Sequence, residues 1–355
     1  MEEPSTLSAM LMCGAKTCPH YDIYIDIVEA KTVDFKDVNL SDNGRPLSYI
    51  NGNARIIRAT LPSRTNQVGI KCIPKKSGEE EYKRQCRALE RELAVWCYLN
   101  NPNTLPLSGI VTLDHGFNIF MSPSAIFDFY GHGDITMYIR SHHKPDELDR
   151  ARLVSDDTGL HRVQDDDYYG LFGPRCYQLY DVTKGLAYIH SQGIVHGDIK
   201  TANVVIDPTS RAQICDFGSA HVLKCSGCIA GPPIQFYSLK SQLYLSPELS
   251  MDGDRDPPTT QASDVWALGC AMLEVQVGRL PYSDENGRYV ERLAMQRQAA
   301  GEMPAGEEAF PPNTISHAIG LVALECWIED PGDRPTAQDV LDMLREAFRS
   351  FDVPL

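Results

Sequence analysis

Two short stretches decide how this chain is interpreted, HGDIKTAN at residues 196–203 and DFG at residues 216–218. Asp198 and Lys200 stand two positions apart, so in an extended loop their side chains point the same way. A carboxylate there accepts the proton of an incoming hydroxyl group, and an ammonium group neutralises charge on a phosphoryl group. The amide oxygen of Asn203 is a suitable ligand for a magnesium ion. The first stretch therefore has the side chains that phosphoryl transfer from ATP needs.

The second stretch supplies a further carboxylate. Asp216 comes directly after a short predicted strand at residues 212–215. A carboxylate at the end of a strand is a second ligand for magnesium that also faces phosphate oxygens. Gly218 lets the chain turn sharply away from the site.

Working outward, the pattern of apolar residues predicts a strand-rich part followed by a helix-rich part. Alternating and β-branched residues predict strands around one amphipathic helix on the N-terminal side. The predicted strands are 55–61, 68–73, 110–113 and 125–129, and the helix is 79–99. Apolar residues at helical spacing predict five helices on the C-terminal side, at 175–190, 262–278, 290–300, 314–328 and 336–348, with a strand-like piece at 203–207 and a loop at 218–243.

Two regions do not fit this scheme. Residues 1–44 are irregular, apart from a loosely alternating stretch at 21–28 that could form a strand. Residues 141–172 are acidic and contain few large apolar side chains, which is typical of a surface insertion. We treat residues 1–44 as an N-terminal extension of unknown role and expect residues 141–172 to lie outside the core.

The composition excludes several classes of function. The 355 residues carry a net charge of −15, which argues against nucleic-acid and anionic-membrane partners because both need a cationic surface. Eleven scattered cysteines indicate a reducing compartment, and the Cys225–Cys228 pair lacks further zinc ligands nearby. The sequence has no signal peptide pattern and no apolar run of membrane-spanning length. We therefore expect a cytoplasmic or nuclear protein.

The order of the motifs resembles that of eukaryotic protein kinases. The loop is similar to H-R-D-x-K-x-x-N except at Gly197, and D-F-G is intact. Further resemblances are Ser246-Pro247-Glu248 to A-P-E, Asp264 to Gly269 to D-x-W-x-x-G, and Cys326-Trp327 with Asp333-Arg334-Pro335 to the closing motifs. The resemblance implies a two-lobed α+β kinase fold at residues 45–350, with an N-lobe at 45–130, a C-lobe at 131–350 and the acidic insertion within it.

The resemblance also implies a role for each site residue. Asp198 and Lys200 are implied as catalytic, and Asn203 and Asp216 as magnesium ligands. Lys71, in a sequence similar to V-A-I-K, is implied to bind ATP phosphates with Glu92 as its partner. The remaining cofactor-binding residues that the family implies surround the adenine: Ile56, Gly69, Phe127, Asp128, Tyr130 and Val205. By the same analogy Glu248 and Arg334 form a buried ion pair.

Two positions depart from the family pattern. The glycine-rich loop is degenerate, because its glycines fall at Tyr49, Asn51 and Ala54. This puts tight ATP binding in question and keeps a pseudokinase, acting as a binding or scaffolding module, as the alternative. Gly197 replaces the arginine that pairs with a phosphate on the activation segment, so we expect activity without strict dependence on phosphorylation there. Candidate phosphorylation sites in that segment are Ser226, Tyr237, Ser238 and Ser241.

The expected partners are ATP, Mg²⁺ and a protein substrate with a serine or threonine acceptor, in intracellular signalling. Lys200, two residues after the expected base, resembles Ser/Thr kinases, and Cys326-Trp327 resembles the tyrosine-kinase-like group among them. The whole string is similar to kinases abundant in mushroom-type fungi. A kinase acting on small molecules is disfavoured, because such enzymes generally lack the Ser-Pro-Glu and Asp-x-Trp elements.

Overall fold

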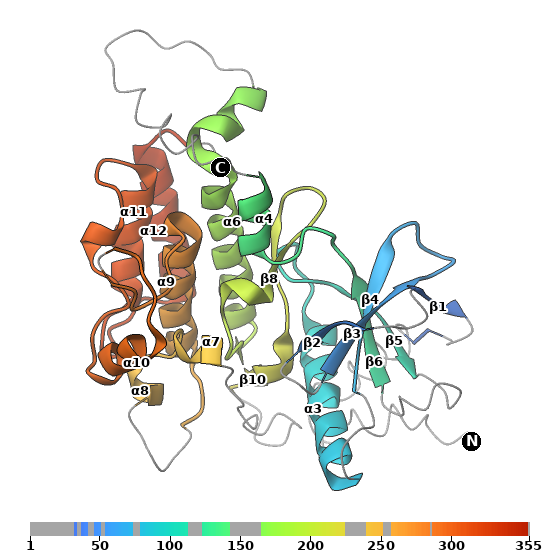
Figure 1. Ribbon diagram of the computed structural model, residues 1–355. Coiled ribbons are helices and arrows are strands. Elements are labelled where there is room, and N and C mark those ends of the chain that lie inside the picture. Colours follow the sequence, from blue (N-terminus) through green and yellow to red (C-terminus); the bar gives the residue numbers. More distant parts are fainter. Residues whose placement is uncertain are drawn as a thin grey trace. The chain divides into compact units, whose positions relative to one another are not determined.

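The computed structural model describes residues 32–33, 37–41, 46–50, 54–73, 79–112, 123–142, 165–223, 239–250, 257–284 and 286–353. The chain divides into two compact units. Unit 1 is Met1–Gly131 with Asp216–Phe236, and unit 2 is His132–Cys215 with Tyr237–Leu355. Figure 1 shows strands gathered in unit 1 and helices in unit 2, which confirms the two-lobed α+β fold expected from the sequence.

Unit 1 is built on an antiparallel sheet. Its strands are β1 (Asn39–Leu40), β2 (Pro46–Ile50), β3 (Ala54–Thr60), β4 (Gln67–Cys72), β5 (Leu107–Thr112) and β6 (Pro123–Asp128). The order across the sheet is β1-β3-β4-β6-β5, with β2 also paired to β3. Strands β2 and β3 form a hairpin in which Ile50 lies opposite Ala54, so the hairpin takes the position of the predicted glycine-rich loop.

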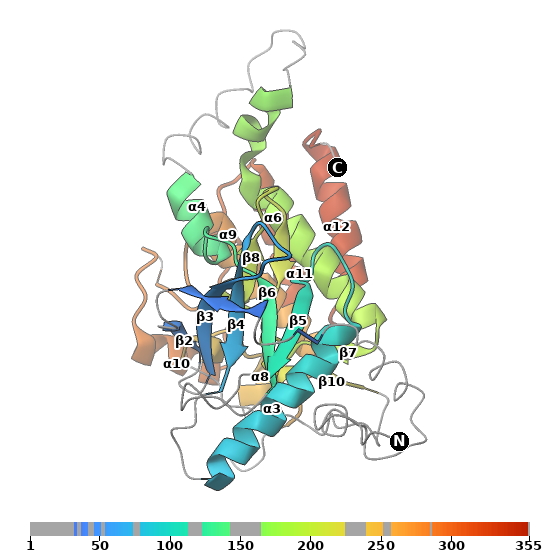
Figure 2. The ribbon, with the colours of Figure 1, turned by 90° about the vertical axis from the view of Figure 1, so that its right-hand side faces the viewer.

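The two faces of β4 have different roles. Val68, Ile70 and Cys72 are fully buried in one apolar cluster of the sheet. Side chains alternate along a strand, so Gly69 and Lys71 belong to the opposite face. Helix α3 (Glu79–Tyr98) packs against β6 and runs beside the sheet in Figure 2.

Unit 2 is mostly helical. Its helices are α4 (Ile135–His142), α6 (Asp165–Ser191), α7 (Leu239–Gln242), α8 (Pro247–Ser250), α9 (Gln261–Val277), α10 (Glu291–Ala299), α11 (Ile315–Cys326) and α12 (Ala337–Ser350). Its short strands are β7 (Ile194–Val195), β8 (Val204–Ile206) and β9 (Ala212–Ile214), and its 3-10 turns are η4 (Thr201–Asn203) and η6 (Glu307–Ala309). Helices α6, α9, α11 and α12 pack on one another (Figure 1).

Capping side chains fix where the long helices begin. Thr260 accepts a hydrogen bond from the backbone N–H of Ser263 at the start of α9, and Ser263 reciprocates. Thr336 and Asp339 form the same capping box at the start of α12. Such boxes satisfy N–H groups that a helix leaves unpaired in its first turn. Helix α9 ends at Gly278, whose φ of 75° suits a glycine.

The predicted helices and strands lie within a few residues of the observed ones, except at the start of α6, and the predicted loop at 218–243 contains β10 and α7 among its described residues. Helix α6 begins at Asp165, ten residues before the start that Pro174 and the nearby glycines led us to predict. The last part of the predicted insertion is therefore helical. The predicted strand at 21–28, residues 143–164 and the Cys225–Cys228 pair lie outside the described residues. Among the described helices, none is long and apolar enough to cross a membrane.

Candidate active site

An ion-paired lysine forms the centre of the site in unit 1. Lys71 Nζ on β4 lies 2.7 Å from Glu92 Oε1 on α3 and 2.7 Å from Asp216 Oδ1. Burial alone would lower the pKa of Lys71, but the carboxylates of Asp216 and Glu92 outweigh it and hold this pKa above its usual value. Lys71 therefore stays charged at neutral pH. The predicted pairing of Lys71 with Glu92 is present, and Asp216 joins it.

Aromatic contacts that sequence reasoning did not predict support this group. The Trp96 ring on α3 lies 5.7 Å from the Phe127 ring on β6 and 5.9 Å from the Phe217 ring, between ring centroids. Trp96 Nε1 donates a hydrogen bond of 2.6 Å to the carbonyl of Leu105. Glu92 stands one helical turn before Trp96 on the same helix, so these contacts fix the orientation of α3 that brings Glu92 to Lys71. The spacing of four residues between Glu92 and Trp96 was the sequence signal that could have shown that the two side chains lie on the same face of the helix.

Asp216 has an unusual backbone conformation. Its φ is 63°, in the left-handed region that residues other than glycine seldom adopt. A 3-10 turn, η5 (Phe217–Ser219), follows it and is succeeded by strand β10 (His221–Val222). Strain of this kind costs about 1–3 kcal/mol and is retained mainly at functional sites.

The predicted adenine-binding residues of unit 1 lie on neighbouring strands. Ile56 on β3 is paired with Lys71, and Gly69 on β4 is paired with Phe127 on β6. A Cβ atom at Gly69 would lie 2.6 Å from the tip of the Phe127 ring, so the glycine makes room for this large side chain. The sequence did not reveal this fit.

Asp128 and Tyr130 follow where β6 ends. The Asp128 carboxylate accepts a hydrogen bond from Arg64 at 2.5 Å and one from Ser108 at 3.3 Å. Tyr130 is half-buried. The segment predicted to contact the adenine is therefore fastened to the β3–β4 turn through Arg64.

The catalytic loop of unit 2 is held by its own side chains. Lys200 Nζ lies 2.5 Å from Asp198 Oδ2 and donates a 2.8 Å hydrogen bond to Ser241 Oγ. Asn203 Nδ2 donates to the backbone carbonyl of Asp198 at 2.8 Å and to its Oδ2 at 3.0 Å. These bonds direct the amide nitrogen of Asn203 inward, so its oxygen is the atom left for a cation. An amide oxygen and a carboxylate are the hard ligands that magnesium prefers, so the side chains of the two predicted ligands, Asn203 and Asp216, are of suitable types.

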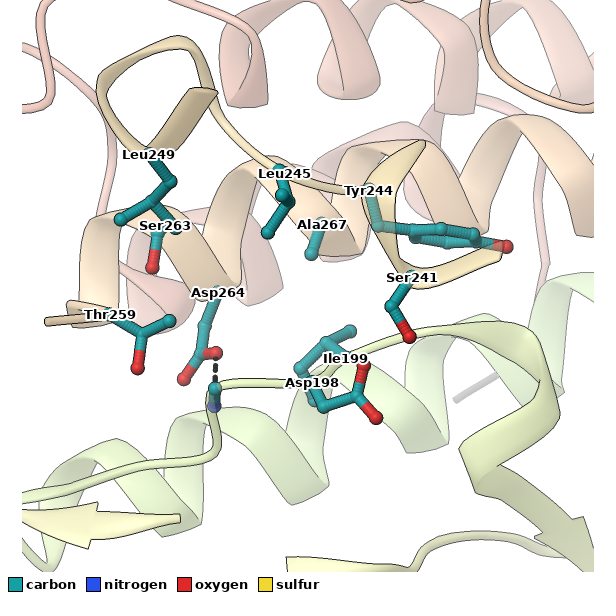
Figure 3. Close-up of a pocket in the computed structure, with 11 residues that line it drawn as sticks. Asp198, Ile199, Ser241, Tyr244, Leu245, Leu249, Thr259, Ser263, Asp264 and Ala267 are labelled. Carbon is teal, nitrogen blue, oxygen red and sulfur yellow. Dashed lines mark hydrogen bonds between the residues drawn. The ribbon is translucent and has the colours of Figure 1, made fainter. Parts of the chain in front are cut away.

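Asp264 on α9 holds the same loop through hydrogen bonds. Its carboxylate accepts hydrogen bonds of 2.8 Å from the backbone N–H groups of His196 and Gly197, the second of which is drawn in Figure 3. The same carboxylate lies 3.0 Å from the ring of His190. Gly197 has a φ of 76°. The loop conformation thus places glycine where any other residue would be strained. The sequence identified Asp264 as part of a motif but did not reveal this contact.

Two further clusters fasten the segment after the loop. Thr201 donates a 2.7 Å hydrogen bond to Glu274 on α9, which also accepts one from Tyr244. The predicted pair of Glu248 and Arg334 is present, with oxygen–nitrogen distances of 3.0 and 3.3 Å and an Arg334 side chain that is fully buried. Burial on its own would raise the pKa of Glu248, but hydrogen bonds from Arg334, Ser246 and the backbone, together with the charge of Arg334, outweigh it and lower this pKa.

A small pocket lies beside Asp198 within unit 2 (Figure 3). Its apolar walls include Ile199, Leu245 and Leu249, and Ser241 contributes a hydroxyl group. Ser241 is buried and bonded to Lys200. Ser241, in the short helix α7, therefore has a structural position, in contrast to the accessible phosphorylation site considered from the sequence.

The structure thus assembles the predicted site residues as two sets. Unit 1 brings together Lys71, Glu92, Asp216, Ile56, Gly69 and Phe127, with Asp128 and Tyr130 at the end of β6. Unit 2 brings together Asp198, Lys200 and Asn203, while Val205 lies on β8 opposite Gln213. The two predicted magnesium ligands, Asn203 and Asp216, belong to different units. Tyr49 lies in β2, whereas Asn51 is outside the described residues.

The arrangement in each unit is that of a protein kinase, and comparison with known proteins agrees. The family model described as "Protein kinase domain" matches residues 172–344. The chain is 33% identical over 166 residues to mitogen-activated protein kinase kinase kinase 1 of Arabidopsis thaliana. It is 27% identical over 265 residues to serine/threonine-protein kinase SSK22 of Saccharomyces cerevisiae, and 27% over 257 residues to mitogen-activated protein kinase kinase kinase 1 of Homo sapiens. Residues 172–344 therefore match the protein kinase domain, and the longer matches to kinases extend this similarity over about 71–72% of the chain.

The extent of these matches differs. They cover 45%, 71% and 72% of this chain respectively, and the chain spans only 24%, 17% and 14% of those three relatives. The match to SSK22 covers 71% of the chain, so it must extend to residues before α6, the first long helix of unit 2. The relatives are named as kinases, which supports the serine/threonine class and gives no support to the pseudokinase alternative. The narrower likeness to mushroom-type fungal kinases stays a prediction.

Proposed function

We propose that this chain is an active serine/threonine protein kinase that transfers the γ-phosphoryl group of ATP to a protein hydroxyl group. The observation that carries the proposal is the catalytic loop, in which Lys200 bridges Asp198 and Ser241. Asp198 Oδ2 is engaged by Lys200 and Asn203, and Oδ1 has no hydrogen-bond partner among the described residues. That oxygen suits a base for an incoming hydroxyl group.

We assign the residues the roles that the kinase resemblance implies. The substrate oxygen forms a bond to the γ-phosphorus, its proton passes to Asp198, and the bond to ADP breaks. Lys200 offsets the negative charge of the transferred group, and Lys71 holds the α- and β-phosphates. Mg²⁺ would be held by Asn203 and Asp216, and it neutralises phosphate charge when bound.

The pocket beside Asp198 suits a side chain of the protein substrate next to the acceptor. Its apolar walls, Ile199, Leu245 and Leu249, favour an apolar residue there. Two of the relatives are named mitogen-activated protein kinase kinase kinases, a name that describes a kinase whose substrate is another kinase. We propose that the substrate of this chain is likewise a protein, in a cytoplasmic or nuclear signalling pathway.

Two measurements test the proposal. Mg·ATP should raise the melting temperature of the wild type, and Asp216→Asn should lose this shift because a metal ligand is gone. Transfer of labelled phosphate to a generic basic protein should fall by about 10²–10⁴-fold in Asp198→Asn. Asp342→Asn, on an exposed part of α12, is the matched control. A wild type that neither binds Mg·ATP nor transfers phosphate would overturn the proposal in favour of a pseudokinase scaffold.

A further inference from the structure

The segment before β2, predicted from the sequence as an extension of unknown role, is bonded to both edges of the sheet in unit 1. We call its described residues, 32–33 and 37–41, the N-terminal strap. At one end Val33 N–H donates a 2.8 Å hydrogen bond to the carbonyl of Ile110 on β5. At the other end Asn39 and Leu40 form β1 and pair with Thr60 and Ala59 of β3. Strands β1 and β5 stand at opposite ends of the sheet order.

The apolar side chains of the strap belong to the core of this sheet. Val38 is 8% exposed, and Val33 and Leu40 are partly buried. They pack with one cluster of strand residues: Ile57, Ala59, Leu61, Val68, Ile70, Cys72, Val111 and Ile126. Because the strand members come from β3, β4, β5 and β6, the strap binds a face that all four strands share.

This face is the reverse side of the nucleotide-binding residues. Ile70 and Cys72, which pack in the cluster, flank Lys71 in the sequence and point away from it. Ile57 in the same way flanks Ile56, whose backbone pairs with Lys71. The strap therefore packs directly behind the two strands that present Lys71 and Ile56.

The strap also leads into the hairpin that replaces the glycine-rich loop. Only residues 42–45 separate it from β2, whose Ile50 lies opposite Ala54 of β3. The hairpin lacks the glycines that let backbone N–H groups approach phosphates closely. Its ability to bind phosphates thus depends on how its two strands are held, and the strap holds β3 through β1.

We propose that Val38 is a positioning residue for nucleotide binding, acting through the N-terminal strap on β3 and β4. This inference rests on the proposed function. Detaching the strap should weaken Mg·ATP binding even though Val38 is none of the nucleotide-binding residues. The affinity of the kinase for its nucleotide is then controlled from sequence that precedes the conserved motifs.

The test compares full-length variants at a temperature well below each one's melting transition. Val38→Asp places a charge in the apolar cluster and should raise the Kd for Mg·ATP by about tenfold. Val38→Ile keeps the packing and should stay within about twofold of the wild type. Leu321→Asp, at a position on α11 that is 45% exposed, is the control and should bind like the wild type.

The outcomes separate positioning from bulk stability. If Val38→Asp melts earlier but binds Mg·ATP with unchanged Kd, the strap merely fills the core and the inference is wrong. If Val38→Asp does not fold, Val38→Ala is compared in the same way, with an expected rise in Kd of about threefold. If the wild type itself binds no Mg·ATP, the proposed function fails. The strap is then judged by amide hydrogen exchange of β4, which should be faster in Val38→Ala than in Leu321→Asp, and equal exchange overturns the inference.

Discussion

Replacing Gly69 by alanine should expose the close fit between β4 and the Phe127 ring. The added Cβ would lie 2.6, 2.7 and 3.3 Å from the Cζ, Cε2 and Cε1 atoms of that ring. Ordinary contacts begin near 3.4 Å, so the ring must move by several tenths of an ångström. Trp96 packs against Phe127 and opposes this movement. Overpacking of this kind destabilises a core by about 1–3 kcal/mol.

The measurement is denaturant unfolding with a matched glycine control. Gly131→Ala is in the same unit, and its Cβ would meet nothing within 4 Å. That control should be neutral or stabilising by about 0.4–1 kcal/mol, because alanine restricts the unfolded chain. In a Phe127→Leu background the ring tip is absent, so Gly69→Ala should cost at least about 1 kcal/mol less there than in the wild type.

Two results would refute this reasoning. One is a Gly69→Ala variant as stable as Gly131→Ala. The other is a cost at Gly69 that is the same with Phe127 as with leucine in its place, which means that the two positions do not interact.

Three further predictions concern other parts of the molecule. Burial raises the pKa of Glu90 from 4.5 to about 7 against the lowering effect of Arg87 and Arg91. The contribution of Glu90 to stability is therefore present below pH 4.5 and lost as the pH rises through 7. In thermal melts, Glu90→Gln should raise the free energy of unfolding by about 1–3 kcal/mol at pH 8 and by almost nothing at pH 4.5. Equal gains in stability at both pH values would refute the assignment. Gly197→Ala should lower the free energy of unfolding by about 1–2 kcal/mol, because the φ of this residue is 76°. Phosphatase treatment of the wild type should leave its kinase activity within about twofold, since residue 197 is not an arginine that could pair with a phosphate. Ser241→Ala removes the second partner of Lys200, so kcat should fall about tenfold with little change in the KM for ATP; a rise in KM at constant kcat would contradict this role.

The elements with strong periodicity could be predicted from the sequence, because burial on one face imposes that periodicity. Helices α9 to α12 and strands β3 to β6 lie within a few residues of their predicted positions. Helix α6 was the exception, since Gly170, Gly173 and Pro174 are poor helix formers. Intrinsic propensity is a weak guide that the rest of the structure overrides.

Contacts between distant parts of the chain could not be read from local patterns. The pairing of Lys71 with Glu92 was found through the motif resemblance, because periodicity alone left Glu90 as an alternative. Ser241 looked like an exposed hydroxyl in a loop, and its bond to Lys200 spans 41 residues of sequence. Nothing in the composition of residues 32–33 and 37–41 indicated that they pack on the sheet, because such short segments show no period.

Because of its aromatic contacts, Trp96 can serve as an intrinsic fluorescence probe of α3. The chain has three tryptophans, and Trp266 and Trp327 are both buried in unit 2. Replacing these two by phenylalanine leaves Trp96 as the single indole fluorophore, between Phe127 and the ring of the DFG motif. Its emission would then follow the environment of α3 alone, and a change in wavelength on adding nucleotide would record the movement of Glu92's helix in real time.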